Sequence, residues 1–505
     1  MNTRWSSTAD ASGSAILGLV AIQLLICLPL AWVLNLYVDE VYSLHTSSQG
    51  LLAALSGGIR FERQAPLYFG LLSLWRLIDP SVFFARLLSV LCISASLLVL
   101  ARIARRLYPS VHPAWFVAPF ALHPSAIWAA VEIRVYALAI LLAALLLWTG
   151  LAAFFSPERQ RRSLVAFIAT AALSLYTYYY LGFLLVGLGA ALLATGRARE
   201  LGRYALALAA AGVLCAPIAL WLGGQTGPGT AMERLGLLGA VRLWVAILAD
   251  ELVPGHRLIA AIASRDARWV ARIGLFALLA AVAIRWQLPA RLREREVLLF
   301  AVVTAVAALV FAAVAWLVGR ILVEDPRYWS YLCLPGTIAL VSAASASRPA
   351  HALSTAVAVL IAAHVAALVQ IYRPLAKPSD AARVAALLTR EAQPGEPILV
   401  FPNEWVLPLR YYYRGSNVLM PVPREPSLER YDWSDLGVHS EQELDAMMRQ
   451  LPADPTALWL VEDEEIYRGR EVLERYVDRH FTVEASWPFY RKLIVERLRR
   501  RSALR

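Results

Sequence analysis

The sequence predicts a polytopic α-helical membrane protein with a small extracytoplasmic α/β domain at its C-terminal end. Three observations support this fold class. Of the 505 residues, 59% are hydrophobic and only 17% are charged, whereas soluble globular proteins have about 45–50% apolar and about 25% charged residues. Apolar runs long enough to cross a bilayer recur as far as residue 371. From about Tyr372, prolines, charges and short alternating patterns replace them.

About eleven apolar runs are candidates for membrane spans. They cover residues 14–36, 82–101, 111–131, 135–155, 163–177, 178–195, 204–222, 269–287, 297–318, 329–347 and 350–371. No charged loop separates the two runs within 163–195, so their division is the least clear. The run 65–78 is shorter and contains Arg76, which is typical of a re-entrant or interfacial helix. The first run is too long for a signal-peptide core, and we predict that it is a retained signal anchor.

Clusters of arginine predict the orientation of the chain in the membrane. They comprise Arg102, Arg105 and Arg106; Arg159, Arg161 and Arg162; Arg197, Arg199 and Arg203; and Arg285, Arg291, Arg293 and Arg295. Each cluster occupies an alternate loop, which the positive-inside rule places in the cytoplasm. The N-terminus is then cytoplasmic, and the loop 223–268 and the C-terminal domain lie outside the inner (plasma) membrane. The net charge of +11 therefore reflects topology, and we predict no nucleic-acid partner.

The predicted domains are a transmembrane domain over residues 1–371 and a soluble α/β domain over residues 372–505. About 130 residues are enough for a domain with its own core. The expected elements are a helix capped by Ser379-Asp380 that runs to about Glu391, buried strands at 398–401 and 457–461, and a strand pair over 481–497.

Carboxylates and arginines gather in the loops that this topology places outside the membrane. They are Asp39 and Glu40, Glu62 and Arg63, Glu132 and Arg134, and Glu324, Asp325 and Arg327. Asp39-Glu40 directly follows the first span, where carboxylates are costly unless they face water or a polar cavity. A carboxylate can deprotonate a hydroxyl, and an arginine fork binds phosphate. The outer face therefore has the groups for a reaction that needs a base and a bound anion.

The order of these motifs resembles that of GT-C glycosyltransferases of the protein O-mannosyltransferase and lipid A aminoarabinose transferase type. The resemblance extends from the first span to about residue 350. It rests on Asp39-Glu40, Ala65-Pro-Leu-Tyr68, Phe84-Ala-Arg-Leu-Leu-Ser-Val90, Glu132-Ile-Arg-Val-Tyr136, Tyr176-Thr-Tyr-Tyr-Tyr180 and Pro326-Arg-Tyr-Trp-Ser-Tyr-Leu-Cys-Leu-Pro335. Each motif is weak alone, and their order is the specific signal. Ala65, Val131 and Tyr178 stand where the family often has Pro, Gln and His, which bears on the sugar and acceptor contacts.

The resemblance implies a GT-C-like fold and the inverting transfer of a sugar from a polyprenyl-phosphate donor to an acceptor hydroxyl at the outer face. Asp39 would be the catalytic base, with Glu40 beside it as a second candidate. The lipid phosphate would be bound by Arg134 and Arg327. Further candidate substrate contacts are Glu132, Tyr136, Tyr178 and Tyr328. The implied partners are the polyprenyl-phosphate sugar, the lipid bilayer and an acceptor that is a protein, a lipid or a glycan.

Other interpretations of the same residues stay open. Arg134 could extend to the lipid headgroups, Arg327 could pair with Glu324 or Asp325, and the tyrosines could form an aromatic belt. The histidine spacing supports no metal or other cofactor, although Asp39 and His45 together could bind a divalent ion.

Two other functional classes also stay open. A transporter or flippase for lipid-linked sugars would have charges deep within the spans of two related halves. A non-catalytic scaffold in envelope assembly would tolerate the loss of Asp39.

Overall fold

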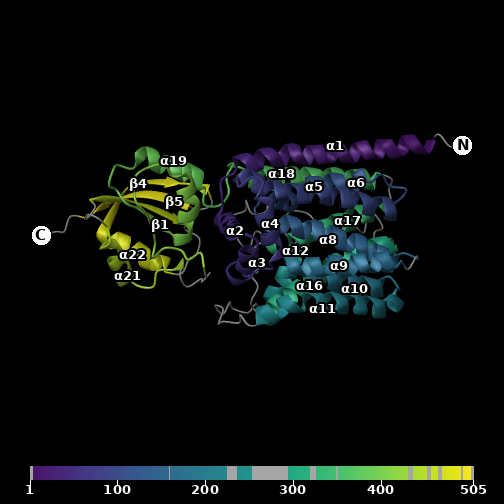
Figure 1. Ribbon diagram of the computed structural model, residues 1–505. Helices are drawn as coiled ribbons and strands as arrows, with labels where there is room; N and C mark the ends of the chain where they lie inside the picture. The colour runs from purple at the N-terminus through teal and green to yellow at the C-terminus, as the bar shows by residue number, and fades with distance from the viewer. Residues whose placement is uncertain are drawn as a thin grey trace. The chain divides into compact units, whose positions relative to one another are not determined.

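The computed structural model describes residues 4–157, 160–223, 236–252, 294–318, 326–347, 351–429, 436–451, 456–463, 469–490 and 493–501. The chain forms two compact units (Figure 1). The first comprises Met1–Trp32, Gly50–Ile59 and Gln64–Ile371, and the second comprises Val33–Gln49, Arg60–Arg63 and Tyr372–Arg505. The second unit thus combines the C-terminal part of the chain with two short segments from near the N-terminus.

The described secondary structure elements of the first unit are all helices, and its long helices run alongside one another (Figure 1). The longer helices are α1 (Arg4–Val33), α5 (Val82–Leu107), α8 (Tyr136–Gly150), α9 (Arg161–Thr177), α10 (Leu181–Ala194), α11 (Leu201–Gly223), α12 (Leu237–Leu252), α16 (Arg295–Val318), α17 (Cys333–Ser345) and α18 (Ala352–Ile371). The shorter ones are α3 (Leu51–Arg60), α4 (Leu67–Trp75), α6 (Ala114–Ala121) and α7 (Pro124–Ala130), with a π-helical turn at Leu151–Phe155 and 3-10 turns at Ala198–Glu200 and Pro326–Leu332.

Six of the described helices are long and apolar enough to cross a membrane, which makes this chain a membrane protein. They are Gly13–Val33, Val82–Leu107, Tyr136–Phe155, Ala198–Ile218, Arg295–Leu317 and Ala352–Ile371. The predicted spans 163–177, 178–195 and 329–347 correspond to the shorter helices α9, α10 and α17. The predicted span 269–287 lies outside the described residues. The count of eleven therefore stays a prediction.

Two predictions for this part of the chain need correction. The run 111–131 is not one continuous helix, because Pro124 begins α7 and His123 precedes it with an extended backbone. Proline lacks an amide hydrogen and disfavours helical geometry in the residue before it. The loop 223–268 contains the helix α12, whose Trp244 side chain donates a hydrogen bond to the Ala305 carbonyl of α16 at 3.1 Å.

Close backbone approach and buried polar contacts hold the first unit together. A side chain at Gly187 of α10 would place its Cβ atom 2.6 Å from the Val303 carbonyl oxygen of α16. The buried Arg86 of α5 donates to the Ala31 carbonyl of α1 at 2.9 Å. Small residues that let helix backbones approach are typical of membrane helix packing, where water does not drive association.

The second unit contains a five-stranded sheet in the order β2-β1-β3-β5-β4. Its strands are β1 (Ile398–Phe401), β2 (Leu419–Pro421), β3 (Ala457–Asp463), β4 (Phe481–Pro488) and β5 (Leu493–Arg500). β1 pairs in parallel with β2 and β3, whereas β5 pairs antiparallel with β3 and β4. The helices are α2 (Val38–Ser48), α19 (Ala381–Glu391), α20 (Val406–Tyr412), α21 (Glu441–Met448) and α22 (Arg470–His480), with a 3-10 turn at Asn403–Trp405.

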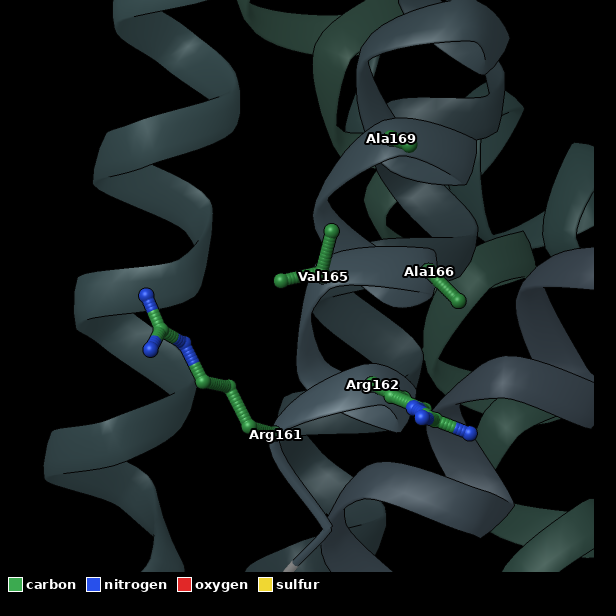
Figure 2. Close-up of a pocket in the computed structure, with 5 residues that line it drawn as sticks. All are labelled: Arg161, Arg162, Val165, Ala166 and Ala169. Atoms are coloured by element: carbon green, nitrogen blue, oxygen red, sulfur yellow. The ribbon is translucent and has the colours of Figure 1, made fainter.

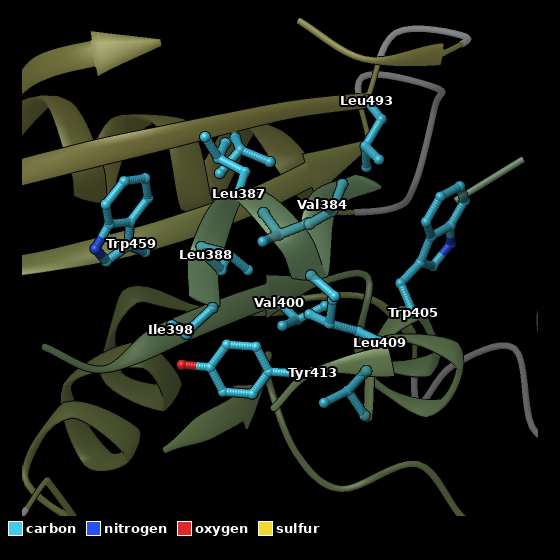
Figure 3. Close-up of a cluster of buried hydrophobic side chains, with 14 residues drawn as sticks. Val384, Leu387, Leu388, Ile398, Val400, Trp405, Leu409, Tyr413, Trp459 and Leu493 are labelled. Atoms are coloured by element: carbon cyan, nitrogen blue, oxygen red, sulfur yellow. The ribbon is translucent and has the colours of Figure 1, made fainter. Parts of the chain in front are cut away.

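Helices cover the central strands of this sheet on both faces. Ile398 and Val400 of β1 contribute to a hydrophobic core shared with α19 and α20 (Figure 3). Leu399 and Phe401 contribute to a second core, shared with α21 and α22. Successive side chains of a strand point to opposite faces, so a strand covered on both faces is apolar without alternation. This explains the run Ile-Leu-Val-Phe at β1.

The elements predicted after residue 372 are present, with one difference in how α19 begins. Asp380 precedes this helix with a left-handed backbone (φ 41°) and makes no capping hydrogen bond to it. Its carboxylate instead accepts a hydrogen bond from the Arg383 side chain at 2.8 Å. The predicted helix start is therefore correct, whereas the predicted capping contact is wrong.

Candidate active site

Asp39 and Glu40 lie in the first turn of α2, in the second unit. Carboxylates are favourable there because the unpaired amides and the dipole at a helix N-terminus carry partial positive charge. Adjacent helical residues point about 100° apart around the helix axis, and these two differ in environment. Asp39 is half-buried, whereas Glu40 is completely inaccessible to solvent. Asp39 therefore retains some exposed surface, whereas Glu40 has none.

Both carboxylate oxygens of Glu40 have partners within the second unit. Its Oε1 atom lies 2.9 Å from the Nζ atom of Lys377, whose side chain is 3% exposed. Its Oε2 atom accepts a hydrogen bond from the Tyr37 amide at 3.1 Å. The Glu40 side chain thus closes the first turn of α2 and forms a buried ion pair with a residue far along the chain.

Further contacts fix α2 against the C-terminal part of the chain. The Tyr42 hydroxyl donates to the Glu404 carboxylate at 3.1 Å. The Leu36 amide donates to the Tyr412 hydroxyl at 2.9 Å, just before the helix begins. Val38, Tyr42 and Phe61 also form a small apolar cluster, against which Leu407 and Leu428 pack. The turn that carries Asp39 is therefore held by side chains of residues 377–428.

Glu132 and Arg134 lie in the first unit, in the short connection between α7 and α8. Glu132 is 4% exposed and Arg134 is 6% exposed. The Ser89 hydroxyl of α5 donates a hydrogen bond to the Glu132 carbonyl at 2.7 Å and fixes this connection. Buried ionisable residues in a membrane domain are costly and mark functional positions by default.

Tyrosine side chains connect the region of Arg134 to the region of Arg327. Tyr136 begins α8, and its ring centroid lies 6.0 Å from that of Tyr178. The Tyr178 hydroxyl donates to the Tyr328 carbonyl at 3.0 Å. The Arg327 guanidinium lies over the Tyr328 ring, 5.1 Å from its centroid. The structure thus links four predicted residues of the first unit, Tyr136, Tyr178, Tyr328 and Arg327, and Arg134 lies two residues before Tyr136 in the sequence. Glu324 and Asp325 lie outside the described residues.

The spacing along α2 bears on the alternative of a metal held by Asp39 and His45. Six helical residues separate positions by about 9 Å along the axis and by about 240° around it. The two side chains therefore do not point to one ion. Among the residues that the structure describes, no group of three or more His, Cys, Asp or Glu side chains is placed to hold a metal.

A surface hollow of about 560 Å³ lies elsewhere on the first unit, along α9. Figure 2 shows Arg161 and Arg162 at one end of it and Ala169 at the other. Tyr178 follows the opposite end of this 17-residue helix, which is about 25 Å long at 1.5 Å per residue. The hollow is thus remote from the tyrosine cluster and shares no residue with the predicted site.

The sequence prediction did not include Lys377. It lies in the C-terminal part of the chain, and its backbone amide bonds a side chain 342 residues earlier. The one available signal was composition, since Lys377 and Lys492 are the only lysines in an arginine-rich sequence.

Comparisons with known proteins give similarity to solved structures. No protein-family model matches the chain, and no curated protein matches it. Two structures of ArnT from Cupriavidus metallidurans are similar over 96% of this chain and 98% of theirs. The apo structure has 15% sequence identity and a TM-score of 0.45, and the structure bound to undecaprenyl phosphate has 16% and 0.44. ArnT belongs to the aminoarabinose transferase group, which the motif order of this chain resembles.

Proposed function

We propose that this protein is a membrane glycosyltransferase that transfers a sugar from a polyprenyl-phosphate donor to an acceptor hydroxyl at the extracytoplasmic face of the inner membrane. The observation that carries the proposal is the contrast between Asp39 and Glu40 in the first turn of α2. Glu40 is buried and paired with Lys377, while Asp39 is only partly buried. A fixed, accessible carboxylate is what a general base requires.

The proposed step is a single displacement at the anomeric carbon. Asp39 accepts the proton of the acceptor hydroxyl, whose oxygen attacks the sugar from the face opposite the phosphate. The bond between the sugar and the phosphate breaks, and the polyprenyl phosphate leaves with the electron pair. The configuration at the anomeric carbon is inverted. Glu40 does not react and holds the turn that carries the base.

Arg134 and Arg327 are the proposed partners of the lipid phosphate. A guanidinium presents several donors in a planar fork that matches phosphate and stabilises the charge of the leaving group. Glu132, Tyr136, Tyr178 and Tyr328 are the proposed donor contacts. Tyr136, Tyr178, Tyr328 and Arg327 are linked by successive contacts, and Glu132 and Arg134 precede Tyr136 in the sequence. In the proposed topology, the apolar helices of residues 1–371 cross the membrane and residues 372–505 form an extracytoplasmic domain.

Replacement of Asp39 by Asn tests the proposed base. Loss of a general base lowers a rate by about 10²–10⁴-fold, so the variant should leave envelope glycans and glycolipids unmodified. Mass spectrometry of these fractions, from cells with either protein at equal abundance in the membrane, measures the effect. Ser48→Ala, at the exposed end of the same helix, is the matched control and should retain activity.

If the Asp39→Asn variant still modified envelope glycans or glycolipids as fully as the wild type, the assignment of Asp39 as the base would be contradicted. Identical envelope masses with and without the wild-type protein would contradict the transferase itself.

A further inference from the structure

Residues 35–40 and 377–379 are joined by several hydrogen bonds and one ion pair within the second unit. The Lys377 amide donates to the Asn35 side chain at 2.7 Å. The Ser379 hydroxyl donates to the Leu36 carbonyl at 3.4 Å. The Lys377 ammonium pairs with Glu40 at 2.9 Å. Lys377 is therefore held through its backbone by Asn35, four residues before Asp39, and through its side chain by Glu40, one residue after Asp39.

The backbone that follows Lys377 is strained. Ser379 and Asp380 have positive φ angles of 74° and 41°, which non-glycine residues rarely adopt. Such conformations persist only where the surrounding contacts determine the geometry, and they gather at functional sites. The strain thus indicates that the position of residues 377–380 against α2 is imposed by the fold.

A buried ion pair adds little net stability to a protein. Removing two charges from water costs about as much as their attraction returns, and an apolar pair of similar size is often equally stable or more so. The pair instead fixes the position of α2 relative to the segment that carries Lys377, because the ammonium and the carboxylate meet at a defined distance. The choice of lysine fits this use: nearly all of the 48 basic residues are arginine, and the compact ammonium suits a buried single-point contact.

We propose that Lys377 is a positioning residue for the base Asp39, acting through Glu40. The ion pair holds the first turn of α2 in one orientation, and the adjacent Asp39 thereby keeps a fixed direction toward the acceptor hydroxyl. The C-terminal part of the chain is then a component of the catalytic centre. The catalytic part of this inference rests on the proposed function, whereas the ordering of α2 by Lys377 does not.

Peptide-resolved hydrogen–deuterium exchange on the full-length protein in nanodiscs tests the ordering directly. Lys377→Met should speed exchange in the peptide covering residues 34–49 by at least about tenfold, because the first turn of α2 loses its anchor. Exchange in β1 and β3 should not change. Arg410→Met, which breaks an ion pair between exposed side chains in the same unit, is the matched control and should leave residues 34–49 as in the wild type.

Two further variants separate positioning from folding. Lys377→Met combined with Glu40→Gln leaves no buried unpaired charge and should fold, yet it should still show fast exchange in residues 34–49. Its kcat should fall about 10–100-fold, with little change in the KM for the donor, since small misplacements of reacting groups have effects of this size. Lys377→Arg keeps the positive charge at this position. Its exchange rate in residues 34–49 and its kcat should therefore lie between those of Lys377→Met and the wild type.

Wild-type exchange in residues 34–49 of the double variant would overturn the proposed role of Lys377. Fast exchange with wild-type kcat would overturn its link to catalysis. Absence of transfer by the wild-type protein itself would instead count against the proposed function and leave the exchange result interpretable.

Discussion

At the scale of single residues, two neighbouring carboxylates have different environments that their sequence position does not reveal. Asp39 and Glu40 are chemically similar and share one helical turn. Glu40 faces Lys377 and the Tyr37 amide, while Asp39 is only partly buried. The difference comes from the 100° rotation between successive helical residues and from the part of the chain that covers one side of the turn.

Arg134 should determine donor affinity. A hydrogen bond to a charged group contributes about 1.5–3 kcal/mol, so Arg134→Ala should raise the KM for a polyprenyl-phosphate sugar by about 10–100-fold. Arg134→Lys should have an intermediate effect, because it keeps the charge but loses the planar fork. Steady-state kinetics in nanodiscs measures both.

Arg161→Ala is the control for Arg134, because Arg161 begins α9 at the end remote from the tyrosine cluster. It should leave the KM unchanged. A wild-type KM in Arg134→Ala would remove this arginine from the proposed phosphate contacts.

The sequence could supply the candidate base and arginines because they lie in short motifs beside apolar runs. It could not supply Lys377, whose partners Asn35 and Glu40 lie more than 300 positions away and whose role depends on tertiary contact. Nor could it show that Tyr178 contacts both Tyr136 and the Tyr328 backbone. Side-chain proximity between distant loops is a property of the fold.

At the scale of elements, apolar period and length predicted the long helices and the central strands. They did not predict α2, because Val38–Ser48 is polar for a membrane domain and its helix is stabilised by tertiary contacts with Glu404 and Leu407. They also failed to predict the helix break at Pro124, because the apolar run continues through it. An apolar run predicts which residues are buried. It does not predict where a helix ends, because that depends on how individual backbone amide and carbonyl groups are satisfied.

The packing of α10 against α16 should depend on Gly187. Gly187→Ala would place a methyl group 2.6 Å from the Val303 carbonyl oxygen, and overpacking of this kind destabilises by about 1–3 kcal/mol. Thermal unfolding in detergent should show a lower Tm. Gly212→Ala in α11 is the matched control, since a Cβ atom there meets nothing within 4 Å. Equal melting temperatures for the two variants would contradict the close approach.

The sheet of the second unit should lose stability in acid through Glu396. Burial alone would raise the pKa of this carboxyl, but hydrogen bonds from Arg497, the Gln393 amide and Trp459 hold its pKa below the ordinary value of 4.5. A carboxyl with a lowered pKa contributes stability above its unfolded pKa, and that contribution is lost as the pH falls through the folded value. Glu396 thus stabilises the contact between β1, β3 and β5 near neutral pH.

Glu396→Gln should therefore lower the stability of the sheet by about 1 kcal/mol at pH 7. The difference from the wild type should shrink as the pH falls below about 4.5. Hydrogen exchange of β1 and β5 as a function of pH measures it. Glu425→Gln, in the exposed pair with Arg410, should have a smaller effect at every pH. A difference for Glu396→Gln that stays constant down to pH 3 would contradict the carboxylate's role.

At the scale of the whole molecule, arginine distribution predicts which ends of the helices face the cytoplasm. Arg197 and Arg203 hydrogen-bond carbonyls at the end of the π-helical turn after α8, so these arginines also have structural partners. The same arginines can therefore follow the positive-inside rule and also make local hydrogen bonds within the fold.

Cysteine labelling tests the predicted topology. The four native cysteines are buried, so labelling of the native protein should be low. Ser416→Cys, at an exposed position before β2, should react with a membrane-impermeant maleimide in intact spheroplasts. Arg199→Cys, exposed before α11, should react only after permeabilisation. The opposite pattern would invert the predicted orientation.

The discontinuous second unit also sets an order of events during synthesis. Asn35 and Leu36 are translated early, but Lys377 follows Asn35 by 342 residues and Tyr412 follows Leu36 by 376. At about 5–20 residues per second, roughly half a minute separates α2 from the residues that fix it. A growing chain therefore carries the candidate base long before it carries the anchor, and translation arrested between the two would leave a protein that is inserted but unable to orient Asp39.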